Sequence, residues 1–143
     1  MSAATTEIIA RAVIHRDGQL LVARQRTKSW SFLPGGHVEP GERVEAALIR
    51  ELSEELGTEA KIAGFVGAVE HGYIEDGTTH HEINLVFDVA ITDTEPISQE
   101  DHLDFRWLPL DQLGEADVRP GALKTALVTA GDDRTPFWQG WNG

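Results

Sequence analysis

The sequence contains no cysteine among its 143 residues. Disulfide bonds, thiolate metal ligands and a cysteine nucleophile are therefore excluded. Long apolar runs are also missing, because no stretch approaches the roughly 20 residues that a membrane-spanning helix needs. The N-terminal stretch lacks the basic segment and the apolar core of a secretory signal. These absences predict a cytoplasmic protein that does not act in a membrane.

Positive charge is scarce as well. The chain has 12 Lys and Arg residues against 24 Asp and Glu residues, which gives a formal net charge of −12. Because proteins bind the nucleic-acid backbone through clustered positive charge, we expect no DNA or RNA duplex as a partner. The acidity does not exclude small phosphorylated ligands, since a bound divalent cation can invert the local field.

The composition is that of an ordinary globular protein, with 41% hydrophobic and 25% charged residues. A chain of this length can bury a core of its own as one domain. We therefore predict a single domain over residues 1–143, with flexible or peripheral ends at residues 1–5 and 132–143.

Hydrophobic periodicity and turn signals predict a mixed α+β layered domain. Aliphatic residues at every fourth position and the final Gly57 predict a helix over residues 43–57. The Pro-Gly-Gly run at 34–36 is expected to stop a short strand at 31–33. The other predicted elements are strands at 7–15, 19–24, 61–73, 80–91 and 103–110, and a second helix at 120–131.

Three carboxylates of the helix predicted at 43–57 share one face. At about 100° per residue, Glu54 and Glu55 lie roughly 60° and 40° to either side of Glu51. Like charges at this spacing destabilise a helix unless a cation lies there. Mg²⁺ takes oxygen ligands and holds phosphate oxygens in its remaining sites. The upstream glycines leave backbone groups unobstructed for a metal-bound diphosphate, so we predict a cation site rather than a solvated helix face.

The stretch from residue 36 to residue 58 resembles the signature of the Nudix hydrolase family, G-x5-E-x7-R-E-U-x-E-E-x-G-U, in which U is a bulky aliphatic residue. The residues that match it in order and spacing are Gly36, Glu42, Arg50, Glu51, Leu52, Glu54, Glu55 and Gly57. The one departure is Thr58, at a position that serves packing rather than chemistry.

The resemblance implies a fold and an activity. The fold would be an α/β/α sandwich with a central mixed β-sheet. The activity would be hydrolysis of a nucleoside diphosphate linked to another moiety, with Mg²⁺ or Mn²⁺ as cofactor and a nucleotide-like small molecule as substrate. The alternative is a Nudix-like domain that binds a nucleotide as a sensor without hydrolysing it. The complete set of carboxylates disfavours this alternative, because non-catalytic relatives usually lose one or more of them.

The resemblance also implies roles for the motif residues. Glu51, Glu54 and Glu55 would be metal ligands, joined by the carbonyl of Gly35. Either Glu51 or Glu54 would combine metal binding with abstraction of a proton from the attacking water. Arg50 would orient the carboxylates and is expected to pair with Glu42 across the loop. Arg50 and Glu42 complete the predicted catalytic set.

Cations outside the motif are candidates for binding substrate phosphates. Arg24 and Arg26 end the strand at 19–24, where members of the family often place such cations. The alternative is an exposed basic loop that partly offsets the acidity of the chain.

Further candidates lie on the second half of the predicted sheet. The strand at 80–91 alternates, which predicts one apolar face and one mostly polar face bearing Glu82 and Asn84. This strand should run under the site, so either residue would contact substrate or metal, or else be solvated. Tyr73 is a candidate for holding a nucleobase, though it could equally belong to the core.

An acidic pair precedes the strand at 103–110. In several members of the family an acidic residue at this kind of place reaches the metal site as a further ligand or base, so Glu100 and Asp101 are candidates, with loop charge as the alternative. Trp138 and Trp141 are unusual for a tail. We expect them to fold back on the domain or to meet a second subunit in a homodimer, because free indoles would form an exposed apolar patch.

Overall fold

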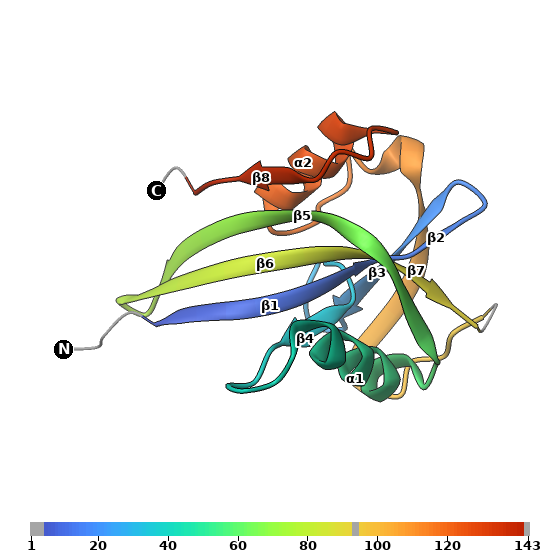
Figure 1. Ribbon diagram of the computed structural model, residues 1–143, viewed down its shortest axis with the longest axis horizontal. Coiled ribbons are helices and arrows are strands. Elements are labelled where there is room, and N and C mark those ends of the chain that lie inside the picture. The colour runs from blue at the N-terminus through green and yellow to red at the C-terminus, as the bar shows by residue number, and fades with distance from the viewer. Residues whose placement is uncertain (1–4, 93–94, 142–143) are drawn as a thin grey trace.

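The computed structural model describes residues 5–92 and 95–141. Its strands are β1 (Thr6–Val13), β2 (His15–Arg16), β3 (Gln19–Gln25), β4 (Gly35–His37), β5 (Ala60–Glu75), β6 (Thr78–Ile91), β7 (Leu103–Pro109) and β8 (Phe137–Gln139). Its helices are α1 (Val44–Leu56), the 3₁₀ helix η1 (Leu110–Gln112) and α2 (Gly121–Ala130). Figure 1 shows a long curved sheet with the shorter strands behind one end of it.

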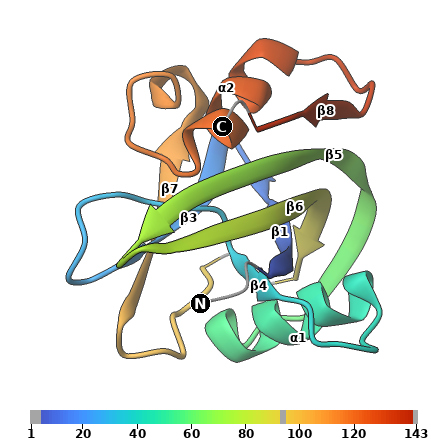
Figure 2. The same ribbon diagram turned by 90° about the vertical axis from the view of Figure 1, so that its left-hand side faces the viewer.

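The strands form two sheets. Sheet A has the order β4-β1-β6-β5-β8, and sheet B has the order β2-β3-β7. Sheet A is mixed, because β1 pairs in parallel with β6 and β5 with β8, whereas β4 and the β5–β6 pair are antiparallel. The helix α1 packs against β4 and β1 at one edge of sheet A, and α2 packs against β8 and β5 at the other (Figure 2). The predicted mixed α+β layering is confirmed.

Two hydrophobic clusters cover the two faces of sheet A. The first joins α2 to both sheets and contains Val13, Leu20, Val22, Leu33, Val69, Val86, Leu108, Leu113, Val118 and Leu123. The second lies under α1 and contains Ala10, Ala12, Ile14, Leu21, Leu48, Leu52, Leu56, Phe87 and Val89. The alternation predicted for the strand at 80–91 is present, since Phe87 and Val89 pack in the second cluster, but the middle of the mostly polar face is buried. Asn84 and Val86 lie on that face and are 0% exposed, because α2 and sheet B cover it.

The segment predicted as one strand at 7–15 is divided between the two sheets. β1 ends at Val13 in sheet A, and β2 begins at His15 in sheet B. Between them, Ile14 is 2% exposed and its carbonyl accepts a hydrogen bond of 3.0 Å from the Leu21 N–H. The chain therefore changes sheets at a buried residue, which alternation along the sequence does not reveal. Both predicted helices are confirmed within a residue or two of their ends.

The strand predicted at 31–33 consists of isolated bridges at Ser31 and Phe32 that end before Pro34, but Gly35 and Gly36 begin a new strand, β4. A side chain on Gly35 would collide with the Ala10 carbonyl oxygen, and its φ of 138° favours glycine. A Cβ on Gly36 would lie 2.5 Å from the carboxyl carbon of Glu51. The two glycines therefore allow β4 to fit between β1 and the carboxylates of α1. They serve close approach rather than chain reversal.

The C-terminal tail folds back on the domain. β8 is an edge strand on β5, and the Phe137 ring lies against Gly67, where a Cβ would overlap it. Trp141 lies against Gly72 in the same way, whereas Trp138 is 63% exposed. Residues 1–4 and 142–143 of the predicted peripheral ends lie outside the described residues. In the described part of the chain, no helix is long and apolar enough to span a membrane.

Candidate active site

The helix α1 presents its carboxylates toward β4 because its other face is buried. Leu48, Leu52 and Leu56 are at most 2% exposed and anchor the helix in the second cluster. Glu55 is 7% exposed, and its Oε2 accepts a hydrogen bond of 3.3 Å from the Gly35 N–H. Glu51 lies beside the neighbouring glycine of β4. A helix anchored by leucines and a strand of glycines thus bring the carboxylates into one place.

Arg50 connects the carboxylates. Its Nε and Nη2 donate to the two oxygens of Glu42 at 2.8 and 3.0 Å, which is a bidentate ion pair. Its Nη1 lies 3.1 Å from Glu51 Oε1 and 3.4 Å from Glu54 Oε2. The structure therefore contains the pairing of Arg50 with Glu42 that the sequence predicted. One arginine is held by the loop before α1 and in turn holds two carboxylates of the helix.

Burial and mutual repulsion change the acidity of these carboxyl groups. Burial, followed by the charge of Glu51, raises the pKa of Glu55 to about 8. Burial also raises the pKa of Glu51, against the opposing effect of Arg50. In contrast, the hydrogen bonds from Arg50 lower the pKa of Glu42 to about 2. Two carboxylates are therefore costly to ionise in place, and a nearby cation would remove that cost.

The donor set fits a hard divalent cation. It consists of carboxylate oxygens and the backbone of β4, and a Cβ at Gly36 would fill the space beside Glu51. Among the described residues no three or more His, Asp or Glu side chains are already grouped as a metal site. Arg50 Nη1 lies between Glu51 and Glu54. Glu51, Glu54 and Glu55 would hold such an ion together with the Gly35 carbonyl, and Glu42 keeps Arg50 beside these carboxylates.

Arg11 on β1 lies within electrostatic reach of Glu55 and Glu51, and the sequence patterns did not single it out. Its Nε donates to Asn84 Oδ1 at 3.3 Å, and its Nη1 donates to the Leu33 carbonyl at 3.0 Å. Burial lowers the pKa of Arg11, whereas the charges of Glu82, then Glu55 and then Glu51, raise it. An arginine side chain remains protonated under such conditions. A single cation within an apolar strand was the signal that could have identified it.

One predicted acidic residue, Glu100, acts on a motif carboxylate, and another, Glu82, acts on Arg11. Glu82 is the carboxylate that acts most strongly on Arg11, and the charge of Glu100 contributes to the raised pKa of Glu55. Asn84 is not exposed to a ligand, since it is fully buried and bonded to Arg11, with a weak contact of 3.5 Å to the Val69 carbonyl. Its predicted contact with substrate or metal is therefore wrong, and its contact is with an arginine instead.

The two predicted phosphate-binding cations are bound to a common partner on sheet B. Arg24 Nη2 lies 3.4 Å from Asp104 Oδ2, and Arg26 Nε lies 3.0 Å from Asp104 Oδ1. Arg24 is half-buried and its Nη1 also donates to the Lys28 carbonyl at 3.4 Å, whereas Arg26 is exposed and keeps more of its donors available. Within residues 5–92 and 95–141, neither arginine forms an ion pair with the motif carboxylates, and Asp101 forms no hydrogen bond or ion pair.

Tyr73 belongs to a stack of rings on sheet A. Its ring lies 4.7 Å from that of His80 at an interplanar angle of 7°, and 5.4 Å from that of His71. Tyr73 is 36% exposed, and burial followed by the charge of Glu82 raises its pKa. The ring stack is thus close to Glu82, on the face of sheet A that also bears Arg11.

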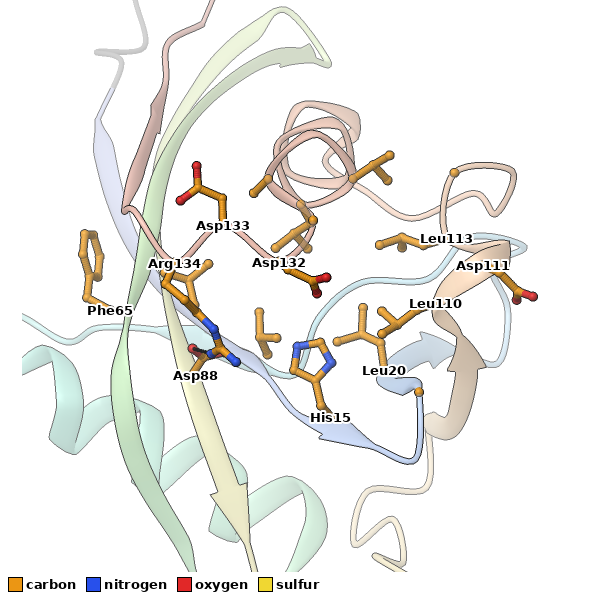
Figure 3. A pocket seen from close by; sticks show the side chains of 18 residues that line it. His15, Leu20, Phe65, Asp88, Leu110, Asp111, Leu113, Asp132, Asp133 and Arg134 are labelled. Carbon is orange, nitrogen blue, oxygen red and sulfur yellow. Dashed lines mark ion pairs between the residues drawn. The ribbon is translucent and has the colours of Figure 1, made fainter.

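A separate pocket lies between α2 and the end of sheet A remote from β4 (Figure 3). It has a volume of about 670 Å³ and is lined by apolar side chains such as Leu20 and Leu127, with the Asp88–Arg134 ion pair at its border. None of its lining residues belongs to the stretch from residue 36 to residue 58. A search for the site by pocket shape alone would therefore select a region without the motif carboxylates. The chemistry of those carboxylates is the better guide to the active site.

Comparison with known proteins agrees with this geometry. The NUDIX domain family matches residues 6–127, which is most of the chain. The protein therefore belongs to the Nudix hydrolase family, and both the resemblance seen in its sequence and the predicted fold are confirmed. Members of this family typically depend on a divalent metal.

Individual relatives narrow the class of enzyme. A nucleoside triphosphatase NudI from Escherichia fergusonii is 34% identical over 125 residues, covering 79% of this chain and 89% of the relative. A CTP pyrophosphohydrolase from Escherichia coli K12 is 45% identical over 67 residues, covering 43% of this chain and 48% of the relative. The protein is a Nudix pyrophosphohydrolase of the MutT- and NudI-like kind.

Solved structures agree with this classification. A MutT NUDIX hydrolase from Burkholderia pseudomallei is 29% identical with a TM-score of 0.65, covering 75% of this chain and 85% of that one. A mutator MutT protein from Bacillus halodurans shares the fold, with a TM-score of 0.73 at 20% identity, and covers 92% of this chain and 89% of that one.

Proposed function

We propose that this protein hydrolyses a phosphoanhydride bond of nucleoside triphosphates, using Mg²⁺ or Mn²⁺ held by Glu51, Glu54, Glu55 and the Gly35 carbonyl. The observation that carries the proposal is the crowding of partly buried carboxylates against a glycine strand, with raised pKa values for Glu51 and Glu55. The names of the relatives favour triphosphates within the wider class of nucleoside diphosphates linked to another group.

The motif residues divide the work of the reaction. A bound divalent cation supplies charge neutralisation of the phosphates and lowers the pKa of a water molecule. Arg50, fixed by Glu42, keeps the carboxylates of α1 in position. Either Glu51 or Glu54 accepts the proton of the attacking water. Glu54 has the more exposed side chain, 53% against 20% for Glu51, and so meets water more readily.

Residues around the carboxylates contact the rest of the substrate in this proposal. Arg24 and Arg26 bind phosphate oxygens with the donors that Asp104 leaves available. Tyr73 offers an aromatic face for the base. Glu82 accepts hydrogen bonds from the base or ribose.

Two acidic residues of the loop before β7 complete the proposed site. Glu100 lies near enough to Glu55 to raise its pKa. It would therefore add a further carboxylate to the cation site. Asp101 is exposed and remains a predicted contact.

A hydrolysis screen tests the proposal. Purified protein is incubated with CTP, the other ribo- and deoxyribonucleoside triphosphates, ADP-ribose, NADH and a nucleotide sugar, each with Mg²⁺ and with Mn²⁺. A Glu54→Gln Glu55→Gln variant prepared in parallel is the control. We expect release of pyrophosphate or phosphate from at least one triphosphate, well above the control. Turnover of only the non-triphosphate compounds would overturn the substrate class, and binding without turnover would overturn the proposed chemistry.

A further inference from the structure

Arg11 is held in place by uncharged partners although charged ones are near. Two of its three nitrogens donate to neutral acceptors, the Asn84 amide oxygen and the Leu33 carbonyl. The carboxylates of Glu82, Glu55 and Glu51 stabilise its charge, yet none of them accepts a hydrogen bond from it in the described part of the chain. The hydrogen bonds to Asn84 and Leu33 therefore orient the guanidinium, and its donors are not occupied by an ion pair.

The third nitrogen of Arg11 is available to a ligand. Nη2 has no hydrogen-bond partner among residues 5–92 and 95–141. A buried atom without a partner would count as unsatisfied, and Nη2 is not one of these atoms, so Nη2 is exposed to solvent. This arginine is mostly enclosed and is held at two of its nitrogens, so the donors of the third point in one direction. Binding of an acceptor at that nitrogen therefore costs little side-chain entropy.

The position of Arg11 selects an anion as that acceptor. Arg11 pairs in register with Gly35, the residue whose N–H donates to Glu55. The charges of Glu55 and Glu51 act on its guanidinium, which is therefore within electrostatic reach of the carboxylates that hold the cation in the proposed function. A polyphosphate bound there carries oxygens beyond those that the cation contacts, and phosphate oxygens are the acceptors that a guanidinium binds most strongly.

We infer that Arg11 binds a phosphoryl oxygen of the substrate through Nη2 and that buried Asn84 is the residue that positions it. The inference rests on the proposed function, since it places the polyphosphate at the carboxylates of α1. The competing explanation is that Arg11 only offsets the negative charge of its neighbours. That explanation needs a cation but no particular geometry, so lysine would replace arginine without loss.

Calorimetric binding separates the two explanations. The probes are inorganic tripolyphosphate and CTP, each titrated with Ca²⁺ present into wild type, Arg11→Lys and Asn84→Leu. Arg134→Lys is the matched control, because Arg134 is 88% exposed and lies at the remote pocket. We expect Arg11→Lys to weaken both probes by about 10- to 100-fold, Asn84→Leu to weaken them by less, and the control to bind as wild type does. Thermal unfolding of each variant identifies any loss of folded protein.

The double variant Arg11→Lys Asn84→Leu tests the positioning role. If Asn84 acts only through Arg11, the double variant binds tripolyphosphate no more weakly than Arg11→Lys alone. Additive losses would overturn the role of Asn84. Unchanged tripolyphosphate affinity in Arg11→Lys, or a loss confined to CTP, would overturn the phosphate contact while the hydrolysis screen still succeeds. Failure of the wild type to bind or hydrolyse any nucleotide would instead overturn the proposed function.

Discussion

The candidate site has two sides that are built in different ways. The carboxylate side comprises residues 35–57, a continuous stretch in which β4, a loop and α1 bring together partners that are at most 20 residues apart in sequence. The strand side comprises Arg11, Tyr73, Glu82 and Asn84, which come from β1, β5 and β6 and meet only when sheet A forms. The first side contains the residues that match the family signature, and the second lies outside that signature.

The two sides also contain residues that differ in tolerance to change, although Asn84 of the strand side is at least as buried as Glu55. Glu55 and the leucines behind α1 are nearly inaccessible, and a Cβ on Gly35 would meet the backbone of Ala10 and Arg11. Tyr73 is one-third exposed and stacks only on histidine rings. We therefore expect substitutions on the carboxylate side to affect catalysis or folding as a whole. Substitutions on the strand side should change which substrate binds and how tightly.

The largest effect should follow removal of charge from the carboxylate side. Glu54→Gln Glu55→Gln should lower kcat by about 1,000-fold or more, because both oxygen ligands and a candidate proton acceptor are lost. Steady-state hydrolysis of the best substrate from the screen measures the effect. Glu59→Gln, a change at an exposed residue just after α1, is the control. A double variant that keeps a tenth of the activity would show that the reaction does not depend on these carboxylates.

The next effect concerns the backbone of the carboxylate side. Gly35→Ala should destabilise the fold by about 2–4 kcal/mol, because the new Cβ meets the Ala10 carbonyl and the residue has a φ that alanine rarely adopts. Urea unfolding measures the change. Gly114→Ala is the matched control, since nothing lies within 4 Å of its Cβ position. Equal midpoints for the two variants would mean that β4 adapts more easily than its geometry indicates.

A smaller effect is expected on the strand side. Tyr73→Ala should raise KM for a nucleotide by roughly 3- to 10-fold and leave kcat nearly unchanged, because a stacked ring contributes about 1 kcal/mol to binding. Ile74→Ala is the control, as the neighbouring side chain is 74% exposed. The measurement is steady-state kinetics with both variants. A loss confined to kcat would place Tyr73 with the catalytic residues and remove the distinction between the two sides.

The difference between the two sides also explains what the sequence could predict. The carboxylate side was predictable because helical spacing and a short motif define it. The pairing of Arg50 with Glu42 followed from the same stretch. Arg11 and the burial of Asn84 were not predictable, because each depends on which strands become neighbours.

The fold shows the same limit. Helix positions and the longer strands followed from periodicity, whereas the change of sheet at Ile14 and the docking of β8 on β5 depend on tertiary packing. The glycines of β4 were interpreted as a chain break because the sequence does not show that Ala10 and Glu51 occupy the space beside them. Local patterns therefore predict elements well, and contacts between distant segments poorly.

The smallest effect is a pH dependence of stability that arises on the carboxylate side. The pKa of Glu55 is raised from 4.5 to about 8 on folding, chiefly by burial. Between these values the folded protein binds more protons than the unfolded protein, so the contribution of Glu55 to stability declines as pH rises from about 4.5 to about 8.

In metal-free buffer, Glu55→Gln should remove this decline and give a melting temperature a few degrees above wild type at pH 8. Differential scanning calorimetry across this range measures it. Glu59→Gln is the matched control, because Glu59 is exposed and is not among the charges that act on Glu51 or Glu55. A Glu55→Gln protein with the slope of wild type would show that burial of this carboxylate is not what makes the metal-free site costly, and that the carboxylate side is no more constrained than the strand side.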